Sequence, residues 1–474
     1  MKPSERFGLI VRVIGLTSRL LPLTLVIGVL VGNRAWGKPE AGPWRAHARI
    51  IFDETAWNWN WSSWDQEKIA TYGDFQYTVY WDADQVMVLV RRDLRDNTLQ
   101  PLRLPKCTLK NNDRHRNTCL GISAADGRLH FSWDHHVDQL HYTKSRAGFL
   151  TDPSATIRAE DIESPQPMLS DPARERGVTY PRFVMDGKGA LFCTYRIGGS
   201  GNGDNVLNRY DAKTATWKRL GMIFSREGIY GPWNNSTSRC AYLHDLLFDR
   251  RQRLHATWVY REAGATWASN HDLHYAYSDD GGLTWCNNGG KKIADLPAGD
   301  PIALDDPGIV VVRIPVYSWM MNAACMALDS KNRPHVVTYK STRPHRPAKL
   351  DHNPPREILE AQVFVHYWRD DDGQWRGGQS IKPGALPRRP DIVFDQQDTM
   401  YLYWTTPVGF RCLQASAGAA WQRWTGYALT GPAFIGTDAS KHDRVRWREK
   451  GILSFTAQPN PGGFAILDFT LSTE

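Results

Sequence analysis

The stretch AADGRLHFSW at residues 124–133 has the pattern of a β-hairpin, with a polar turn followed by an alternating strand that ends in an aromatic residue. The same pattern returns four times along the chain, and more weakly at residues 80–90 and 452–469. The clear copies read MDGKGALFCTY (185–195), FDRRQRLHATW (248–258), LDSKNRPHVVTY (328–339) and FDQQDTMYLYW (394–404). A unit of several strands that recurs along a chain is typical of a β-propeller, in which each copy forms one blade.

The spacing of the turns predicts the number of blades. The turn aspartates are Asp82, Asp126, Asp186, Asp249, Asp329 and Asp395. Dividing residues 40–474 among seven blades gives about 62 residues per blade, which is enough for four strands and long loops. No long amphipathic helix pattern interrupts the strands after residue 40. We therefore predict an all-β fold, a single β-propeller, with seven blades over residues 38–474.

Residues 1–37 have the pattern of a secretory signal peptide rather than of a blade. Four cations between residues 2 and 19 precede an uncharged run over 20–32, and small residues at a cleavage site follow at 35–37. The apolar run has 13 residues, fewer than the roughly 20 needed to span a bilayer. We predict a secreted or periplasmic protein with no membrane attachment after cleavage. An uncleaved N-terminal anchor is the alternative.

Composition and charge exclude several classes of protein. The chain has 474 residues, of which 41% are hydrophobic and 23% charged, which excludes a disordered, collagen-like or multi-pass membrane protein. A net charge of +8 first suggests nucleic acid as a partner, but half of that charge lies in the leader and no run of five like charges occurs. We therefore expect no nucleic acid partner. The 20 tryptophans predict sheet packing or stacking on sugars.

The ends of the hairpin strands predict where a functional site lies. In an antiparallel hairpin, the start of the first strand and the end of the second lie at the same end of the sheet. Since the innermost strands of a propeller surround its axis, these ends should meet at one mouth of the central channel. The residues at these positions are His115, His136, Tyr180, Arg196, Arg239, Arg261, Asn322, Lys340 and Arg389. We expect the last five to bind substrate.

A mouth that carries cations, histidines and a tyrosine is suited to an acidic polysaccharide. β-Elimination at a uronate needs a cation that neutralises the carboxylate, a base that removes the C5 proton and an acid that protonates the leaving oxygen. Arg196, with a permanent charge and a fork of donors, fits the first role. Tyr180 and a histidine fit the other two, in either order.

Two groups of motifs resemble the BNR-4 type propeller lyases, a family that includes the ulvan lyases. The first group is His115, LGIS (120–123), DGRLHFSWDHH (126–136) and LHYTKS (140–145). The second is TYPRFV (179–184), YRIGGSGNGD (195–204) and RYD (209–211). The resemblance runs from about residue 56 to about residue 406. It implies a lyase acting on uronate linkages, with His115, His136, Tyr180 and Arg196 as catalytic residues.

Two details of the motifs refine these assignments. His135 and His136 are neighbours on a strand, so only one of them should face the channel. The family pattern often has His-Asn where this chain has His115-Arg116, which makes the role of His115 less certain than that of Tyr180.

Two other classes of function remain open. A propeller glycoside hydrolase, rhamnosidase- or sialidase-like, would need carboxylates, for which Glu262, Asp134 and Asp204 are the candidates. A carbohydrate-binding propeller without turnover would keep the tryptophans and cations but would not need histidine and tyrosine together.

We expect no required cofactor and a monomeric protein whose partner is an acidic polysaccharide or oligosaccharide. No metal site is assigned, although a structural zinc or calcium ion stays open as an alternative. Its candidate ligands in the middle of the chain are His271, His274, Cys286 and His335, whose spacing is not diagnostic. Cys119, Cys193, Cys240 and Cys325 lie in apolar strand-like runs and should be buried without a ligand or a bridge.

Overall fold

The computed structural model describes residues 44–53, 55–60, 67–264, 266–322, 325–347, 354–382, 388–406, 409–429, 441–459 and 463–471. The predicted leader, residues 1–37, lies outside the described residues. These ranges all belong to one compact unit, Pro39–Glu474. None of the helices found within them is both long enough and apolar enough to cross a membrane.

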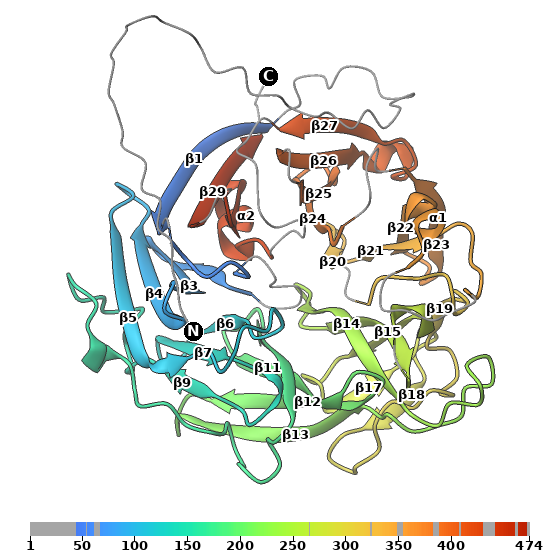
Figure 1. Cartoon of the computed structure of the whole chain (residues 1–474), viewed down its shortest axis with the longest axis horizontal. Coiled ribbons are helices and arrows are strands. Elements are labelled where there is room, and N and C mark those ends of the chain that lie inside the picture. Colours follow the sequence, from blue (N-terminus) through green and yellow to red (C-terminus); the bar gives the residue numbers. More distant parts are fainter. Residues whose placement is uncertain are drawn as a thin grey trace, which may run out of the picture. The chain divides into compact units, whose positions relative to one another are not determined.

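The strands of the described residues form six sheets around a common centre (Figure 1). One of them has 11 strands and divides into two groups, joined where β12 pairs with β14, so that the strands make seven groups, which we call blades. Blade 1 contains β2 (Ile69–Tyr72), β3 (Phe75–Trp81), β4 (Val86–Asp93) and β5 (Leu99–Thr108). Blade 2 contains β6 (Thr118–Ser123), β7 (Arg128–Trp133) and β9 (Tyr142–Lys144). Blade 3 contains β10 (Val178–Met185), β11 (Leu191–Gly199), β12 (Asn202–Asp211) and β13 (Thr216–Phe224), with β8 (His136–Asp138) paired to β10.

Blade 4 contains β14 (Arg239–Phe248), β15 (Leu254–Glu262), β16 (Asn270–Ser278), β17 (Thr284–Cys286), β18 (Lys292–Asp295) and β19 (Val310–Val312). Blade 5 contains β20 (Cys325–Leu328), β21 (Pro334–Ser341), β22 (Gln362–Arg369) and β23 (Trp375–Ile381). Blade 6 contains β24 (Asp391–Phe394), β25 (Met400–Thr406), β26 (Gly409–Ala415) and β27 (Thr425–Leu429). Blade 7 contains β28 (Ile452–Ala457), β29 (Phe464–Leu471) and β1 (Trp44–Asp53). The helical segments are short: α1 (Arg356–Glu360), α2 (Arg444–Lys450) and the 3-10 turns η1 (Ala159–Asp161), η2 (Trp267–Ser269) and η3 (Ala417–Ala419).

Strands from the two ends of the chain close the ring. β1 pairs antiparallel with β29, from Trp44 opposite Leu471 to Asp53 opposite Phe464. Figure 1 shows this pair as a blue strand beside a red one. The first strands of successive blades contact each other around the centre, as β6, β10, β14, β20 and β24 do in turn. The all-β propeller is therefore confirmed, and the grouping of strands is consistent with the seven blades predicted.

Aspartates recur at the turns because their side chains accept hydrogen bonds from backbone N–H groups of the turn. Asp186 Oδ1 accepts hydrogen bonds from the backbone N–H groups of Lys188 and Ala190, both at 2.8 Å. Equivalent pairs of bonds are made by Asp249, Asp329 and Asp395. The residue three positions after each aspartate has a positive φ; these residues are Gly189, Gln252, Asn332 and Asp398. The repeat read from the sequence is thus a repeat of one turn geometry.

Most of the aromatic residues pack between and within the sheets. The fully buried tryptophans are Trp81, Trp258, Trp285, Trp319 and Trp404. The four cysteines predicted to be buried are fully enclosed, and all seven cysteines are free: Cys107, Cys119, Cys193, Cys240, Cys286, Cys325 and Cys412. Sheet packing therefore accounts for these tryptophans, and hydrophobic burial for these cysteines.

A charged segment, residues 441–446, connects blades that are far apart in the sequence. Lys441 and Arg444 contact Asp245 on β14, at 3.1 and 2.7 Å, and Arg444 also contacts Glu67 at 2.9 Å. In the same segment, His442 is hydrogen-bonded to Asp391 on β24, and the Asp443 carboxylate accepts hydrogen bonds from Thr71 and Gln76 of blade 1. Arg182 on β10 donates a hydrogen bond to Asp245 as well. This segment and its partners, which we call the central ionic cluster, join blades 1, 3, 4 and 6.

Candidate active site

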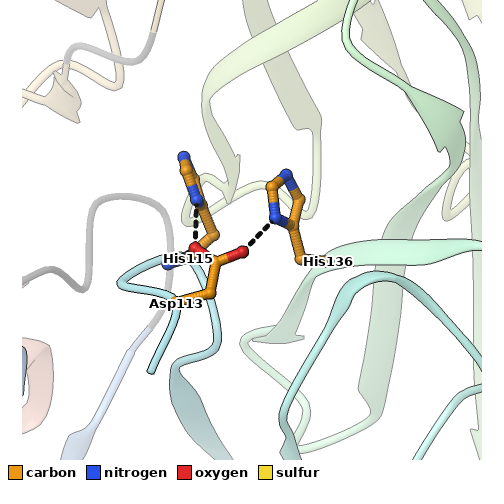
Figure 2. A group of neighbouring side chains, drawn as sticks. All are labelled: Asp113, His115 and His136. Carbon is orange, nitrogen blue, oxygen red and sulfur yellow. Dashed lines mark hydrogen bonds and ion pairs between the residues drawn. The ribbon is translucent and has the colours of Figure 1, made fainter. Parts of the chain in front are cut away.

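The two predicted histidines lie side by side and share one carboxylate. His115 is in the loop between β5 and β6, and His136 is the first residue of β8. Their rings stack with centroids 4.2 Å apart. Asp113 Oδ1 lies 2.6 Å from His115 Nδ1, and Asp113 Oδ2 is hydrogen-bonded to His136 Nδ1. Figure 2 shows the carboxylate of Asp113 with one contact to each ring.

The shared carboxylate determines which ring nitrogens can take part in chemistry. A carboxylate only accepts, so each histidine donates its Nδ1 proton to Asp113, which leaves Nε2 as the nitrogen that carries the lone pair whenever the ring is neutral. Burial, followed by the neighbouring His136, lowers the pKa of His115 to about 4. Burial would raise the pKa of Asp113, but hydrogen bonds from His115 and His136 outweigh it and hold that pKa below its usual range. Near neutral pH, His115 is therefore a neutral imidazole backed by an anion.

His135, the neighbour of His136, has a structural environment. It is 1% exposed, and its Nε2 accepts a hydrogen bond of 2.9 Å from the backbone of His141. The side chain of His136 is 36% exposed. Of the two neighbours, His135 is therefore enclosed and His136 is partly exposed; that His136 faces the channel mouth stays a prediction.

Strand register brings Tyr180 and Arg196 next to the histidine pair. On β10, Thr179 lies opposite His136 of β8 on one side and opposite Arg196 of β11 on the other. Tyr180 follows at a register shift in β10 and has a φ of 55°. A left-handed backbone costs about 1–3 kcal/mol for a non-glycine residue and tends to occur at functional sites. The Tyr180 ring lies 6.4 Å from His115, centroid to centroid.

Arg196 is buried between two tyrosine rings. Its guanidinium carbon lies 5.3 Å from the ring centres of both Tyr180 and Tyr242. The residue is 3% exposed, and its Nε donates to the carbonyl of Gly198 at 3.2 Å. A guanidinium in such a site keeps its charge and is held in one orientation.

Arg261 extends the cationic side of the site. Its Nη1 donates to the hydroxyl oxygens of Tyr242 and Ser200, both at 3.2 Å, and its Nε contacts Asn270 at 2.8 Å. The Tyr242 ring thus contacts two guanidinium groups, those of Arg196 and Arg261. A small cavity of about 20 Å³ has Tyr180, Arg196 and Tyr242 in its lining.

Sequence reasoning missed two residues of this site, Asp113 and Tyr242. Tyr242 stands on β14, three residues after the position Arg239 that the strand-end rule selected. Asp113 precedes the first strand of its hairpin and belongs to no repeated pattern. The short spacing Asp113-x-His115 is the one signal that could have indicated a carboxylate beside the histidine.

The prediction that Arg239 binds substrate is corrected by the structure. Its side chain is 0% exposed, and Glu262 accepts from its Nε at 2.9 Å and from its Nη2 at 3.2 Å. Backbone carbonyls of residues 226, 227, 228 and 236 take further hydrogen bonds from it. The guanidinium is therefore a buried structural cation. Glu262 is equally enclosed, so the carboxylate proposed for a sialidase-like reaction is held in an ion pair.

The other predicted binding residues belong to blades 5 and 6. Asn322 accepts a hydrogen bond of 3.1 Å from Arg389 and is 7% exposed. Lys340, on β21, is half-buried, and burial lowers its pKa. The carboxylates offered for hydrolysis are engaged as well: Asp134 pairs with Arg116 and Asp204 with Arg226. The described contacts connect His115, His136, Tyr180, Arg196 and Arg261, whereas Asn322 and Arg389 form a separate pair.

The candidate metal ligands predicted from the sequence do not form one group. His271 bonds Glu262 and Asp272, and His335 bonds Asp329 and His366. Among the described residues, the cluster with ligand atoms close enough for a metal is Asp113, His115 and His136. Zinc lies about 2.0–2.2 Å from each nitrogen or oxygen ligand, which separates the ligands by more than a hydrogen-bond length. The distance of 2.6 Å between Asp113 Oδ1 and His115 Nδ1 is that of a charge-assisted hydrogen bond.

Part of the chain is similar in sequence to proteins named ulvan lyases. The chain is 25% identical over 281 residues to the long isoform of ulvan lyase from Pseudoalteromonas sp. (strain PLSV), an alignment that covers 50% of this chain and 27% of that protein. It is 25% identical over 239 residues to the short isoform from Alteromonas sp. (strain LOR), covering 41% of this chain and 43% of the relative. The chain therefore matches less than half the length of these relatives.

Solved structures share the fold at low sequence identity. The polysaccharide lyase Uly1 superposes with a TM-score of 0.65 at 14% identity, covering 86% of this chain and 90% of that one. A PL25 ulvan lyase bound to -[GlcA(1-4)Rha3S]- superposes with a TM-score of 0.60 at 12% identity, covering 88% and 95%. The model of the BNR_4 family, described as BNR repeat-containing family member, matches residues 75–381. Because this match spans more than half of the chain, the protein belongs to the BNR repeat-containing family BNR_4.

Proposed function

We propose that this protein is a polysaccharide lyase that cleaves an acidic polysaccharide of the ulvan type, at a uronate linkage, by β-elimination. One observation carries the proposal: a buried guanidinium, Arg196, lies against the ring of Tyr180, which in turn lies beside the stacked pair of His115 and His136. The names of the relatives, ulvan lyases in each case, support the same substrate class. Export after loss of residues 1–37, and action as a monomer, belong to this proposal.

Arg196 neutralises the carboxylate of the uronate. Pairing with a fixed guanidinium withdraws charge from the carboxylate and makes the proton on the neighbouring C5 atom more acidic. Arg261 also lies over the Tyr242 ring, 4.6 Å from its centre, and adds positive potential for a second anionic group of the polysaccharide. Since an arginine supplies this neutralisation, the scheme needs no cofactor.

In this proposal a histidine is the base and Tyr180 is the acid. The Nε2 lone pair of a neutral histidine, His115 or His136, accepts the C5 proton, and the imidazolium that forms is stabilised by the Asp113 carboxylate. The electrons of the C5–H bond form the C4–C5 double bond, and the C4–O bond breaks. Tyr180 takes the role of the acid, and its hydroxyl donates a proton to the leaving oxygen.

A two-channel assay tests the proposal. The protein is incubated with soluble ulvan while near-ultraviolet absorbance and reducing ends are recorded together. The expected result is a rise in both, because elimination creates a C4–C5 double bond at each new non-reducing end. Reducing ends without absorbance would overturn the lyase in favour of a hydrolase, and binding with neither signal would favour a carbohydrate-binding propeller.

A further inference from the structure

A second cavity lies on the outer strands of blade 5, on different elements from the histidine, tyrosine and arginine group. We call it the outer pocket; it has a volume of about 190 Å³. The residues that matter here are His366 and Trp368 on β22, Arg376 and Gln379 on β23, and Trp421 and Trp424 between β26 and β27. Pockets for drug-sized ligands span about 300–1,000 Å³, so this one suits a smaller group.

Aromatic rings form the walls of the outer pocket. The rings of Trp368 and Trp421 meet edge to face at 4.9 Å, and those of His366 and Trp424 do so at 6.0 Å. Trp421 is 3% exposed, and its Nε1 donates to the carbonyl of Asp398 at 2.9 Å, which fixes its orientation. Trp368 and Trp424 are only half-buried, so parts of their rings are open. Such surfaces combine apolar area with low mobility, which suits the C–H face of a sugar ring.

The backbone has positive φ angles on both sides of the outer pocket. Ala420 and Trp421 are successive non-glycine residues with φ angles of 47° and 53°. In β23, Gly377 has a φ of 101°, and a Cβ at this position would lie 2.2 Å from the carbonyl oxygen of His366. These positions fix the course of the backbone on both sides of the outer pocket.

A chain of hydrogen bonds prepares His366 as an acceptor. Asp329 Oδ2 lies 3.3 Å from His335 Nε2, and His335 Nδ1 lies 3.0 Å from His366 Nε2. Burial, followed by His335, holds the pKa of His366 well below its ordinary value, so the ring is neutral. If His335 donates to Asp329, His366 donates to His335, and the Nδ1 atom of His366 keeps a lone pair. A neutral nitrogen acceptor beside open indole rings fits a sugar hydroxyl.

Arg376 adds a positive charge at the rim of the outer pocket. Its side chain is 56% exposed, and its Nε donates to Asp370 at 2.7 Å. A guanidinium has five donors in a fork, so the remaining ones are suited to a carboxylate or a sulfate group. Gln379, exposed on the same strand, offers an amide that can both donate and accept.

We propose that the outer pocket is a second carbohydrate-binding site. It holds one anionic sugar ring of the same polysaccharide that the candidate active site cleaves under the proposed function. This inference rests on the proposed function, since it takes its ligand from the same polymer. A polymer that is long enough to reach both sites binds more tightly than either site alone would allow, whereas a short oligosaccharide gains nothing.

The experiment compares a long and a short substrate. KM and kcat are measured on soluble ulvan and on an ulvan tetrasaccharide for the unaltered protein, Trp424→Ala and Gln379→Ala, with Gln396→Ala on the exposed turn of blade 6 as the matched control. We expect Trp424→Ala to raise KM on ulvan about three- to ten-fold, and Gln379→Ala about two- to five-fold. Neither change should alter kcat or the KM for the tetrasaccharide. Thermal unfolding of each variant identifies any loss of fold.

A binding assay separates this inference from the proposed function. Tyr180→Phe, which should not turn ulvan over, is run by electrophoresis in gels that contain ulvan, alone and combined with Trp424→Ala or Gln379→Ala. Weaker retardation of both double variants supports the outer pocket. Suppose that the unaltered protein cleaves ulvan while the folded variants keep the same KM and the same retardation. This result overturns the proposal of a second binding site and leaves the proposed lyase function intact. No cleavage and no retardation by any uronate polymer overturns the lyase, and the outer pocket with it.

Discussion

The guanidinium carbon of Arg196 lies 5.3 Å from the centre of the Tyr180 ring, on a neighbouring strand of the same blade. In the proposed mechanism, this contact links the group that neutralises a uronate to the group that protonates the leaving oxygen. Both are fixed by the backbone: Arg196 by its register with Thr179, and Tyr180 by its left-handed conformation. Substitutions at these two residues should therefore separate binding from turnover.

Tyr180→Phe should abolish turnover of ulvan while substrate binding is kept. The ring, its contact with Arg196 and its packing against Tyr242 remain, but the hydroxyl proton is lost. Loss of a general acid costs about 100- to 10,000-fold in kcat. Absorbance at the new double bond reports kcat, and gel retardation in ulvan reports binding. A variant that retains more than about a tenth of the activity would contradict the assignment of Tyr180.

Arg196→Lys should lower kcat/KM by about 100-fold or more, although the charge is kept. Lysine cannot supply a planar fork, and its ammonium cannot stack in the same way between Tyr180 and Tyr242. Arg209→Lys, on the exposed side of β12, is the control and should behave as the unaltered protein does. Equal effects of the two substitutions on activity would mean that Arg196 has no special role.

Asp113→Asn should lower kcat by about 100- to 10,000-fold and change its pH dependence. The asparagine amide can accept from only one Nδ1–H, so one histidine must take the other tautomer and lose its Nε2 lone pair. The base works when neutral, so activity should fall as the pH drops through a pKa of about 4 for His115. Without the Asp113 anion, which raises this pKa, the acid limb of the remaining activity should move to lower pH.

The control for this change is Asp152→Asn in an exposed loop. A purely structural role for Asp113 would reduce the melting temperature and leave the position of the acid limb unchanged. A pH–kcat profile for both variants, recorded together with thermal unfolding, decides between these outcomes.

Treatment with a chelator should leave lyase activity unchanged. Arg196 supplies the neutralising charge, and Asp113, His115 and His136 are held by hydrogen bonds. The measurement is the rate on ulvan before and after dialysis against EDTA. A loss of rate that zinc or calcium restores would instead assign a metal to this protein.

The sequence predicted those parts of the fold that repeat. Four of the turn aspartates accept hydrogen bonds from the backbone of their own turn, so the pattern is local and is visible in the sequence of those hairpins; they are Asp186, Asp249, Asp329 and Asp395. The sequence also predicted that His115, His136, Tyr180 and Arg196 lie together. In an antiparallel hairpin, the start of the first strand and the end of the second lie at the same end of the sheet. Their assignment as catalytic residues stays a prediction.

The strand-end rule identified residues at the same end of the sheet, but it did not predict which way each side chain points. Arg239 and Arg261 both stand at strand ends, but Arg239 lies opposite Glu262 and Arg261 opposite Cys240, so they point to different environments. Arg239 turns inward to its carboxylate, whereas Arg261 reaches Tyr242. Direction depends on long-range partners, which a repeat pattern does not contain. The same holds for the central ionic cluster, whose members come from four blades.

Asp245→Asn should destabilise the propeller by about 3–5 kcal/mol, because a buried carboxylate is removed from among several cations. Asp245 is 1% exposed and bonds Arg182, Lys441 and Arg444 at 3.0, 3.1 and 2.7 Å. Burial would raise the pKa of Asp245, but Arg444, Lys441 and Arg182 outweigh it and hold that pKa far below its usual range.

A carboxyl group whose pKa is depressed on folding stabilises the folded state above its unfolded pKa, about 3.9, and loses that contribution as the pH falls. The difference in unfolding free energy between the two proteins, measured with denaturant, should therefore be constant near neutral pH and shrink below about pH 4. Asp372→Asn, on an exposed turn, should show no such difference, and a gap for Asp245→Asn that persists unchanged into acid would show that the ion pairs are not its source.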